Sequence, residues 1–159
     1  MDTRVALVHH KVVVRPPRRT RRVLVSDKDV DKSLKVYIVE DSPVLRERVI
    51  ESLEETGNSR IVGSADTEDD AVSGIIDSVP DAVVLDIQLR EGNGLNVLRR
   101  LRNIDLEVRP LVIILTNYNY PEFRYRAMTA GTDYFFDKAT ELHRVAEIIG
   151  ALRNPVTVH

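Results

Sequence analysis

The 159-residue chain is 43% hydrophobic and 30% charged, which fits one domain with a single core. It contains no cysteine, and this excludes disulfides, thiolate metal sites and cysteine nucleophiles. The formal net charge of −2 hides an asymmetry, because residues 1–34 hold nine of the 23 basic and four of the 25 acidic residues and carry +5, whereas residues 35–159 carry −7.

The basic segment 1–34 precedes every regular pattern in the chain. We expect a disordered extension there, or extra residues from a start codon upstream of the true one. Its basic run, Arg18–Arg22, could attract nucleic acid or an anionic surface. No aromatic residue lies between the arginines, so a single-strand binder that stacks bases is not indicated. The stretch Val12–Val14 could add an edge strand to a sheet or exchange with a second copy.

No segment has the composition of a membrane span or an export signal. The longest apolar run, Leu111–Leu115, is far shorter than the roughly 20 residues that cross a bilayer. The arginine pairs near position 20 are not followed by the apolar stretch of a signal peptide. We therefore expect a cytoplasmic protein without a membrane partner.

From Lys35 onward, a short β-branched or aromatic run is followed five times by a segment with helical spacing. The first helix is predicted from Ser42-Pro43, an N-cap with proline in the first turn, to near Gly57. The second is predicted after the acidic stretch 66–70, with an apolar side that includes Ile76 and Val79. Three more are predicted after Gly94, from Pro121 to Gly131, and up to Leu152. The expected strands are Val36–Val39, Ile61–Val62, Ala82–Leu85, Leu111–Leu115 and Tyr134–Phe136.

Nearly continuous apolar strands between amphipathic helices predict a parallel sheet with helices on both faces. Right-handed crossovers and short loops favour a doubly wound, five-stranded α/β domain. We place this domain at residues 35–153 and a short C-terminal tail at 154–159.

Polar side chains stand where the predicted strands end, namely Glu40 with Asp41, Asp86, Thr116 and Lys138. Taken singly, each could simply end a strand in water. In an open parallel sheet, however, these ends meet at one edge, where ligands bind. Together the five side chains therefore predict a site.

Three carboxylates in one place repel one another unless a cation joins them, and a hard divalent ion such as Mg²⁺ resolves that conflict. An aspartate can then act as a nucleophile towards phosphorus. Phosphoryl transfer needs mainly alignment and neutralised charge, which Mg²⁺ and the point charge of Lys138 supply. The hydroxyl of Thr116 can donate a hydrogen bond to a phosphoryl oxygen.

Over residues 35–152 the chain resembles the receiver domain of two-component response regulators, including the stand-alone receivers of bacterial chemotaxis. That resemblance implies a flavodoxin-like sheet with strand order 2-1-3-4-5. It rests on five motifs in the expected order, namely Val39–Pro43, Val84–Ile87, Gly92–Gly94, Leu115-Thr116 and Ala130–Lys138.

The resemblance also implies roles for single residues. Asp86 matches the phospho-acceptor, and Thr116 and Lys138 match the residues that contact the phosphoryl group. Thr116 and Phe135 match the pair that switches after phosphorylation. Mg²⁺ would be held by the carboxylates of Glu40, Asp41 and Asp86 and by the backbone carbonyl of Gln88.

Three positions depart from the family pattern. Arg90 replaces the usual proline four residues after the phospho-acceptor, and Ala139 replaces the proline after the lysine. A cis bond before a non-proline residue costs about 2.5–4 kcal/mol, so we expect a trans bond and an altered presentation of Lys138. Asn117 stands directly after Thr116, where the family prefers a small residue, and Tyr118 follows it. Both flank the site, and their bulk should hinder both the phosphodonor and the attacking water.

Seven of the eight aromatic residues lie between positions 118 and 136. They could simply pack the fifth strand against its neighbouring helix. They could also form the surface of the fourth helix, fifth strand and fifth helix, which in receivers meets partners. The two interpretations are compatible, because a switch packs differently in its two states.

The preferred hypothesis is a single-domain regulator that accepts a phosphoryl group on Asp86 from a sensor histidine kinase or a histidine phosphotransfer protein. It would act on a downstream protein, as a monomer or weak dimer. It would not be an enzyme beyond its Mg²⁺-dependent self-phosphorylation and dephosphorylation. Two alternatives remain, a receiver-like interaction module that is not phosphorylated, and a regulator that binds nucleic acid through the basic arm, which we do not expect.

Overall fold

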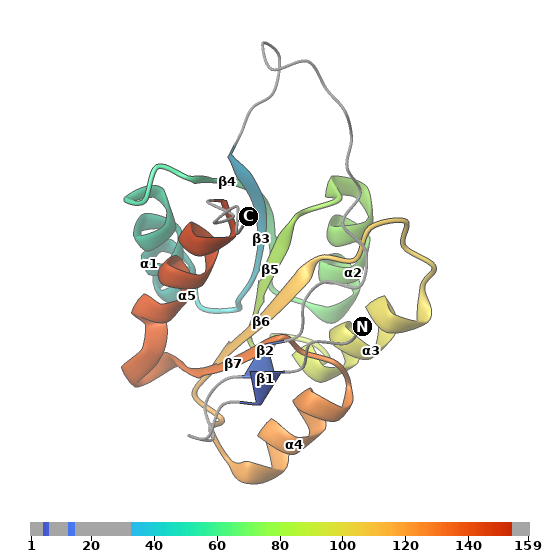
Figure 1. Ribbon diagram of the computed structural model, residues 1–159. Coiled ribbons are helices and arrows are strands. Elements are labelled where there is room, and N and C mark those ends of the chain that lie inside the picture. Colours follow the sequence, from blue (N-terminus) through green and yellow to red (C-terminus); the bar gives the residue numbers. More distant parts are fainter. Residues whose placement is uncertain (1–4, 7–12, 15–32, 154–159) are drawn as a thin grey trace.

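The computed structural model describes residues 5–6, 13–14 and 33–153, and Figure 1 shows its elements in chain order. From residue 34 onward, strands alternate with helices as the sequence pattern predicts. They are β3 (Leu34–Val39), α1 (Pro43–Glu54), β4 (Ser59–Ala65), α2 (Glu68–Ser78), β5 (Ala82–Leu85), α3 (Gly94–Asn103), β6 (Leu111–Thr116), α4 (Pro121–Thr129), β7 (Tyr134–Asp137) and α5 (Lys138–Arg153).

The five strands from β3 to β7 form one parallel sheet in the order β4-β3-β5-β6-β7. Counted from β3, this is the order 2-1-3-4-5, so the predicted flavodoxin-like, doubly wound fold is confirmed. The chain reverses its direction of winding between β3 and β5, which is where such folds bind ligands. Strand β3 begins at Leu34, one residue before the expected start of the domain.

Two further strands lie ahead of the sheet domain. Strand β1 (Val5–Ala6) pairs antiparallel with β2 (Val13–Val14) in a separate two-stranded sheet. Val13 and Val14 therefore pair within the N-terminal segment. They do not extend the edge of the main sheet, which was one of the two possibilities that the sequence offers for Val12–Val14. The basic run Arg18–Arg22 and the tail 154–159 lie outside the described residues, as does most of the predicted extension.

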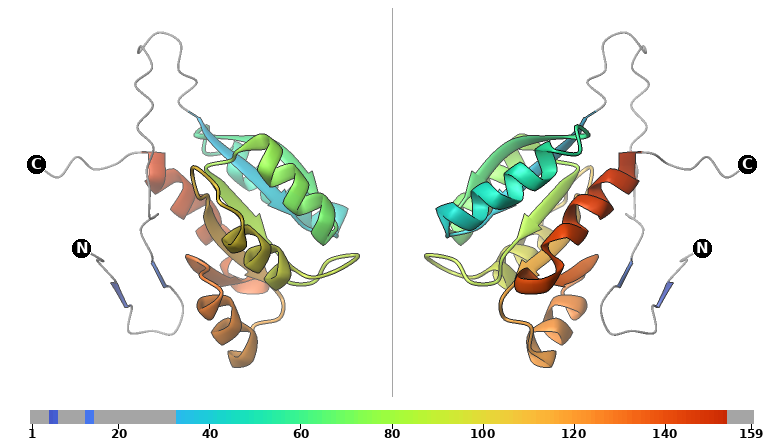
Figure 2. Two further views of the ribbon diagram at one scale, coloured as in Figure 1. Left: turned by 90° about the vertical axis from the view of Figure 1, so that its right-hand side faces the viewer. Right: turned by 90° about the vertical axis from the view of Figure 1, so that its left-hand side faces the viewer.

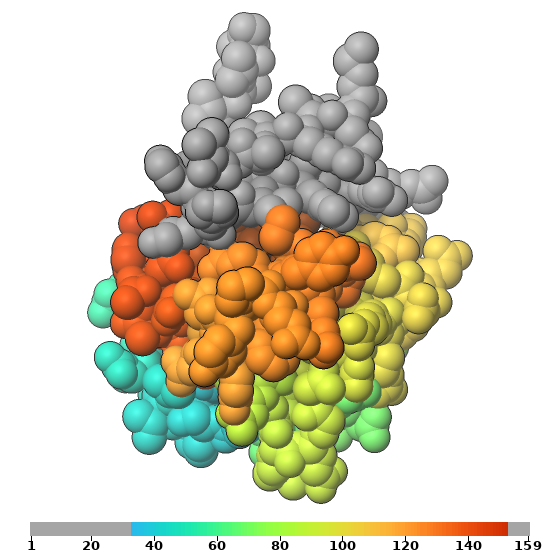
Figure 3. Space-filling view, turned by 90° about the horizontal axis from the view of Figure 1, so that it is seen from below, coloured from blue at the N-terminus to red at the C-terminus, as the bar shows by residue number. Residues whose placement is uncertain are grey.

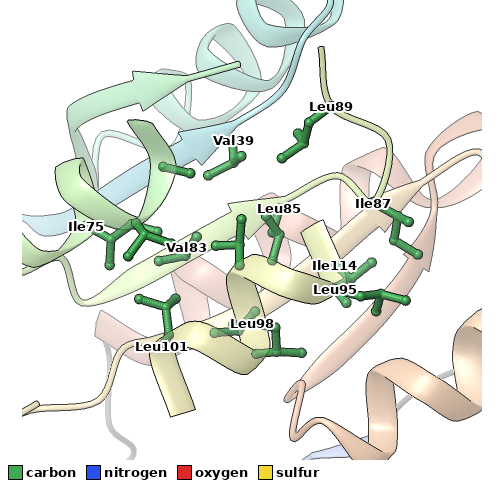
Figure 4. Packing of buried hydrophobic residues seen from close by; sticks show 14 of the residues in the cluster. Val39, Ile75, Val83, Leu85, Ile87, Leu89, Leu95, Leu98, Leu101 and Ile114 are labelled. Carbon is green, nitrogen blue, oxygen red and sulfur yellow. The ribbon is translucent and has the colours of Figure 1, made fainter. Parts of the chain in front are cut away.

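The two faces of the sheet are covered by different helices, as Figure 2 shows. Helices α2, α3 and α4 pack on one face, and α1 and α5 on the other. Alternate strand residues serve the two cores, so that Val83 and Leu85 face α2 and α3 while Val84 faces α1 and α5. Figure 4 shows apolar side chains of α2 and α3 directed at this sheet.

Side-chain caps fix where three helices begin. The hydroxyl of Ser42 accepts a hydrogen bond from the backbone N–H of Leu45 at 3.3 Å, which confirms the predicted start of α1. Thr67 and Asn93 cap α2 and α3 in the same way. The loop that precedes each helix is therefore held at the carboxyl-terminal edge of the sheet.

Helix α2 differs from its sequence prediction at its C-terminal end. Ile76 and Val79 were expected on its apolar side, but they are 40% and 52% exposed. The helix ends at Ser78, and Val79 takes a left-handed conformation with φ of +47°. The chain therefore leaves the helix before its apolar pattern is complete, and Pro80 is buried instead.

Among residues 33–153, no helix combines the length and the apolar composition that a membrane crossing requires.

Candidate functional site

Three side chains from three strand ends meet in a buried cluster. The Nζ atom of Lys138, directly after β7, lies 2.7 Å from Oε1 of Glu40 and 2.7 Å from Oδ2 of Asp86. Glu40 follows β3 and Asp86 follows β5, and the exposed fraction of all three residues is below 10%. The sheet order brings these positions together, and the ammonium group bridges two carboxylates that would otherwise repel each other.

Asp41 completes an acidic group beside this bridge. One carboxylate oxygen each from Glu40, Asp41 and Asp86 lies within 4.8 Å of the others. The second oxygen of Glu40, Oε2, is buried and accepts no hydrogen bond from the described residues. A buried carboxylate oxygen without a partner, beside two more oxygen ligands, suits a hard divalent cation.

Burial governs the protonation of this cluster. It raises the pKa of the Glu40 carboxyl to about 8, and the neighbouring Asp86 adds to this rise while Lys138 opposes it. Burial alone would lower the pKa of the Lys138 ammonium, but its hydrogen bonds to Asp86 and Glu40 prevail and raise it. Lys138 therefore keeps its charge at physiological pH, and Glu40 readily holds a proton.

The backbone after β5 carries Gln88, the residue expected to offer a carbonyl to the metal. The N–H of Gln88 donates to Oδ1 of Asp86 at 3.4 Å, and its side chain is exposed. The same loop is pressed against the start of α3, where a Cβ at Gly94 would collide with the carbonyl oxygen of Asp86. The N–H of Gly94 donates to the carbonyl of Ile87 at 2.7 Å. Glycine is therefore needed at position 94 for Asp86 to stand where it does.

Thr116 and Phe135 lie in β6 and β7, the two strands on the other side of β5 from β3. Thr116 ends β6, is fully buried, and its Oγ1 accepts a hydrogen bond from the N–H of Tyr118 at 3.1 Å. Phe135 is buried on the α2–α3–α4 side of the sheet. Figure 3 shows the loops after β3, β5 and β6 (cyan, yellow-green and orange) gathered on one face.

Residues 36–150 match the family model of the response regulator receiver domain. The chain belongs to this family. The resemblance drawn from the five motifs is therefore confirmed, and the chain is a signalling domain. Receivers typically bind Mg²⁺ at an acidic pocket, and this structure has an acidic cluster of Glu40, Asp41 and Asp86.

Similar proteins support the same assignment. The chain is 34% identical over 111 residues to the virulence-factor transcription regulator BvgA of Bordetella pertussis, covering 70% of this chain and 52% of that protein. It is 32% identical to the DNA-binding transcriptional activator DevR/DosR of Mycobacterium tuberculosis, covering 76% and 56%. A LuxR-family DNA-binding response regulator from Staphylococcus aureus superposes with a TM-score of 0.68 at 27% identity, over 76% of this chain and 99% of that one.

The chain thus spans about half the length of these two curated relatives. The similarity covers the receiver domain, and what the rest of each relative does stays a property of that relative.

At two of the departures from the family pattern, Arg90 and Ala139, the residue that replaces proline makes a hydrogen bond that proline could not make. The guanidinium of Arg90 donates to both carboxylate oxygens of Asp66, at 3.0 and 3.2 Å, and thereby lowers the pKa of that carboxyl. This fork joins the loop after β5 to the loop after β4. No cis peptide occurs among the described residues, so the predicted trans bond before Ala139 is confirmed.

Ala139 also supplies a hydrogen bond that proline lacks. Its N–H donates to Oδ1 of Asp137 at 2.8 Å, so Asp137 caps α5, and that helix begins at Lys138 itself. Lys138 is therefore presented from the first residue of a helix.

The sequence interpretation missed a set of contacts around Phe135. The side chain of Asn119 donates to Asp137 Oδ2 at 3.1 Å, and Arg124 donates to Asn119 Oδ1 at 2.7 Å. The Arg124 guanidinium also lies 4.7 Å from the centre of the Phe135 ring. These polar residues follow no motif and no periodicity, so the sequence held no signal for them.

Proposed function

We propose that Asp86 of this receiver accepts a phosphoryl group and that the phosphorylated form changes the binding of a partner protein. The observation that carries the proposal is the position of Asp86, with a lysine ammonium at 2.7 Å and two more carboxylates in the same cluster. A carboxylate oxygen of Asp86 would attack the phosphorus atom, and the bond between phosphorus and the donor would break as the acyl phosphate forms. The departing donor would take back its electron pair.

The residues present fit a Mg²⁺ ion, because a buried oxygen of Glu40 has no hydrogen-bond partner in the described part of the chain and stands beside two further carboxylates. Glu40, Asp41 and Asp86 would hold it through their carboxylates, and Gln88 through its backbone carbonyl. When bound, the ion supplies positive charge that offsets the negative charge of the carboxylates and the phosphoryl oxygens.

Lys138 and Thr116 would act on the phosphoryl group after it arrives. Lys138 already faces Asp86 and is held by its hydrogen bonds to two carboxylates, so its ammonium can neutralise a phosphoryl oxygen with little rearrangement. The Thr116 hydroxyl, at the end of the neighbouring strand, would donate a hydrogen bond to another phosphoryl oxygen. Its movement would be the first step of the switch.

The expected donor is a sensor histidine kinase or a histidine phosphotransfer protein, whose phosphorylated imidazole is a good leaving group. The expected output surface is α4–β7–α5, in which Phe135 is buried while Tyr120, just before α4, and Tyr125 of this helix are exposed. The tyrosines are 61% and 73% exposed, and aromatic side chains of this kind anchor protein interfaces. We also propose that the receiver acts as a single domain on a separate partner protein, as a monomer or weak dimer.

The test is the intact mass of the protein after incubation with Mg²⁺ and acetyl phosphate. We expect the mass of one added phosphoryl group, lost in Asp86→Asn and kept in the control Asp77→Asn, which changes an exposed aspartate on α2. An adduct that persists in Asp86→Asn would contradict the assignment of the acceptor.

The alternative is a receiver that binds partners without phosphorylation. One observation favours it, because Asn117 and Tyr118 follow Thr116 directly, where their bulk can obstruct access to Asp86. The absence of an adduct from wild type, together with no effect of beryllofluoride on the protein, would support this alternative over the proposal.

A further inference from the structure

Asn119 joins three elements at the switch side of the site. Its side-chain amide donates to Asp137 at the end of β7, and its carbonyl accepts from Arg124 in α4. We call these three residues, Arg124, Asn119 and Asp137, the Asn119 bridge. The bridge spans the loop after β6, helix α4 and the strand that leads directly to Lys138.

The bridge also covers the switch aromatic. The guanidinium of Arg124 lies 4.7 Å from the centre of the Phe135 ring, within the range of a cation–π contact. Arg124 is half-buried, and burial lowers the pKa of its guanidinium although Glu141 and Asp137 raise it. Its hydrogen bond to Asn119 therefore fixes a partly desolvated cation above Phe135.

Thr116 is linked to the same loop from the other side. Its hydroxyl oxygen accepts a hydrogen bond from the N–H of Tyr118, the residue before Asn119. If Thr116 turns towards a phosphoryl group on Asp86, Tyr118 either follows or loses this bond. Movement of Tyr118 displaces Asn119, whose two hydrogen bonds need the present position of the loop.

We propose that the Asn119 bridge stabilises the unphosphorylated arrangement of the switch by holding the loop after β6, α4 and Phe135 together. This inference rests on the proposed phosphorylation of Asp86. Arg124 and Asn119 are positioning residues in it, since neither contacts Asp86. Because the bridge must open during activation, the intact bridge opposes activation. Removing the bridge therefore raises the affinity for a phosphoryl mimic, whereas a merely structural defect would lower that affinity.

The test uses the full chain labelled with fluorinated phenylalanine. The protein has only three phenylalanines, so fluorine NMR gives a simple spectrum, and Phe135→Leu identifies the signal of interest. Wild type, Asn119→Ala and Arg124→Gln are titrated with beryllofluoride in the presence of Mg²⁺. The matched control is Arg126→Gln, which removes an exposed arginine of the same helix that forms an ion pair with Glu122.

We expect both bridge variants to bind beryllofluoride about fivefold more tightly than wild type, and the control to bind as wild type does. In the free protein, the Phe135 signal of Asn119→Ala should also move towards its position in the beryllofluoride complex. Unchanged or weaker binding by both variants would overturn the proposal.

A failure of the proposed function gives a different result. If wild type binds no beryllofluoride, Asp86 is not a working acceptor. The bridge is then tested by the fluorine signal of Phe135 in the protein without beryllofluoride. Asn119→Ala should still move the Phe135 signal, because Arg124 loses its anchor. A Phe135 signal identical to that of wild type would overturn the bridge itself.

Discussion

The ammonium nitrogen of Lys138 lies 2.7 Å from Oδ2 of Asp86, although 52 positions separate the two residues in the chain. The same nitrogen lies 2.7 Å from Oε1 of Glu40. One cation therefore compensates two buried carboxylates. Removing this cation should therefore lower the free energy of unfolding, which can be measured without any assay of signalling.

Lys138→Met keeps the length of the side chain and removes its charge. It leaves the Asp86 carboxylate buried without its cation, so we expect the free energy of unfolding to fall by about 3–5 kcal/mol in Mg²⁺-free buffer at neutral pH. Urea denaturation monitored by circular dichroism measures this change.

Two further variants sharpen the measurement. Arg99→Met removes an exposed arginine and should change stability by no more than about 0.5 kcal/mol. Adding Asp86→Asn to Lys138→Met should restore part of the loss, because the amide carries no charge that needs the missing ammonium. A Lys138→Met protein as stable as wild type would show that the bridge contributes nothing.

The raised pKa of Glu40 predicts how stability depends on pH. The folded protein holds this proton up to a pKa of about 8, whereas the ordinary value is 4.5, so the folded state binds more protons in between. Stability from Glu40 is therefore complete below pH 4.5 and is lost as the pH rises through 8. The raised pKa of Lys138 acts only above its ordinary value of 10.5, outside this window.

We expect wild type to lose stability relative to Glu40→Gln between pH 5 and pH 8.5, by about 1 kcal/mol per pH unit in the steep part. Urea denaturation of both proteins at several pH values, without Mg²⁺, provides the comparison. Parallel pH curves for the two proteins would mean that Glu40 titrates normally.

Strand positions and the central cluster could be predicted because both follow from local pattern. Apolar runs mark buried parallel strands, and a polar residue after each run must stand at the shared edge of the sheet. Glu40, Asp86 and Lys138 meet there as expected. The Arg90–Asp66 fork and the Asn119 bridge could not be predicted, since they join surface residues through loop geometry that leaves no periodic trace.

The end of α2 shows a second feature that the apolar spacing of a sequence does not predict. The apolar spacing continues through Ile76 to Val79, but spacing alone does not reveal where hydrogen bonding stops. The helix ends when Val79 enters the left-handed region, with its N–H bonded to the carbonyl of Ile75. That conformation is costly for a β-branched residue.

Val79→Asn should therefore stabilise the protein. Asparagine tolerates the left-handed conformation far better than valine, and position 79 is 52% exposed, so little packing is lost. We expect a gain of about 0.5–1 kcal/mol in the free energy of unfolding. Val79→Thr keeps the branched Cβ and should give no gain, and thermal unfolding of the three proteins distinguishes these outcomes.

Gly94→Ala tests whether the close approach of α3 positions Asp86. The added Cβ would meet the carbonyl oxygen of Asp86, and the backbone there must shift to admit it. We expect a loss of about 1–3 kcal/mol in stability and a slower formation of the acetyl phosphate adduct. The measurements are urea denaturation and the time course of intact mass.

Gly150→Ala is the matched control, because a Cβ at this position in α5 meets no atom within 4 Å. Alanine favours a helix interior over glycine, so this variant should gain about 0.5–1 kcal/mol and keep the wild-type rate of phosphorylation. If Gly94→Ala behaved like Gly150→Ala in both measurements, the contact between α3 and the backbone of Asp86 would have no part in positioning the acceptor.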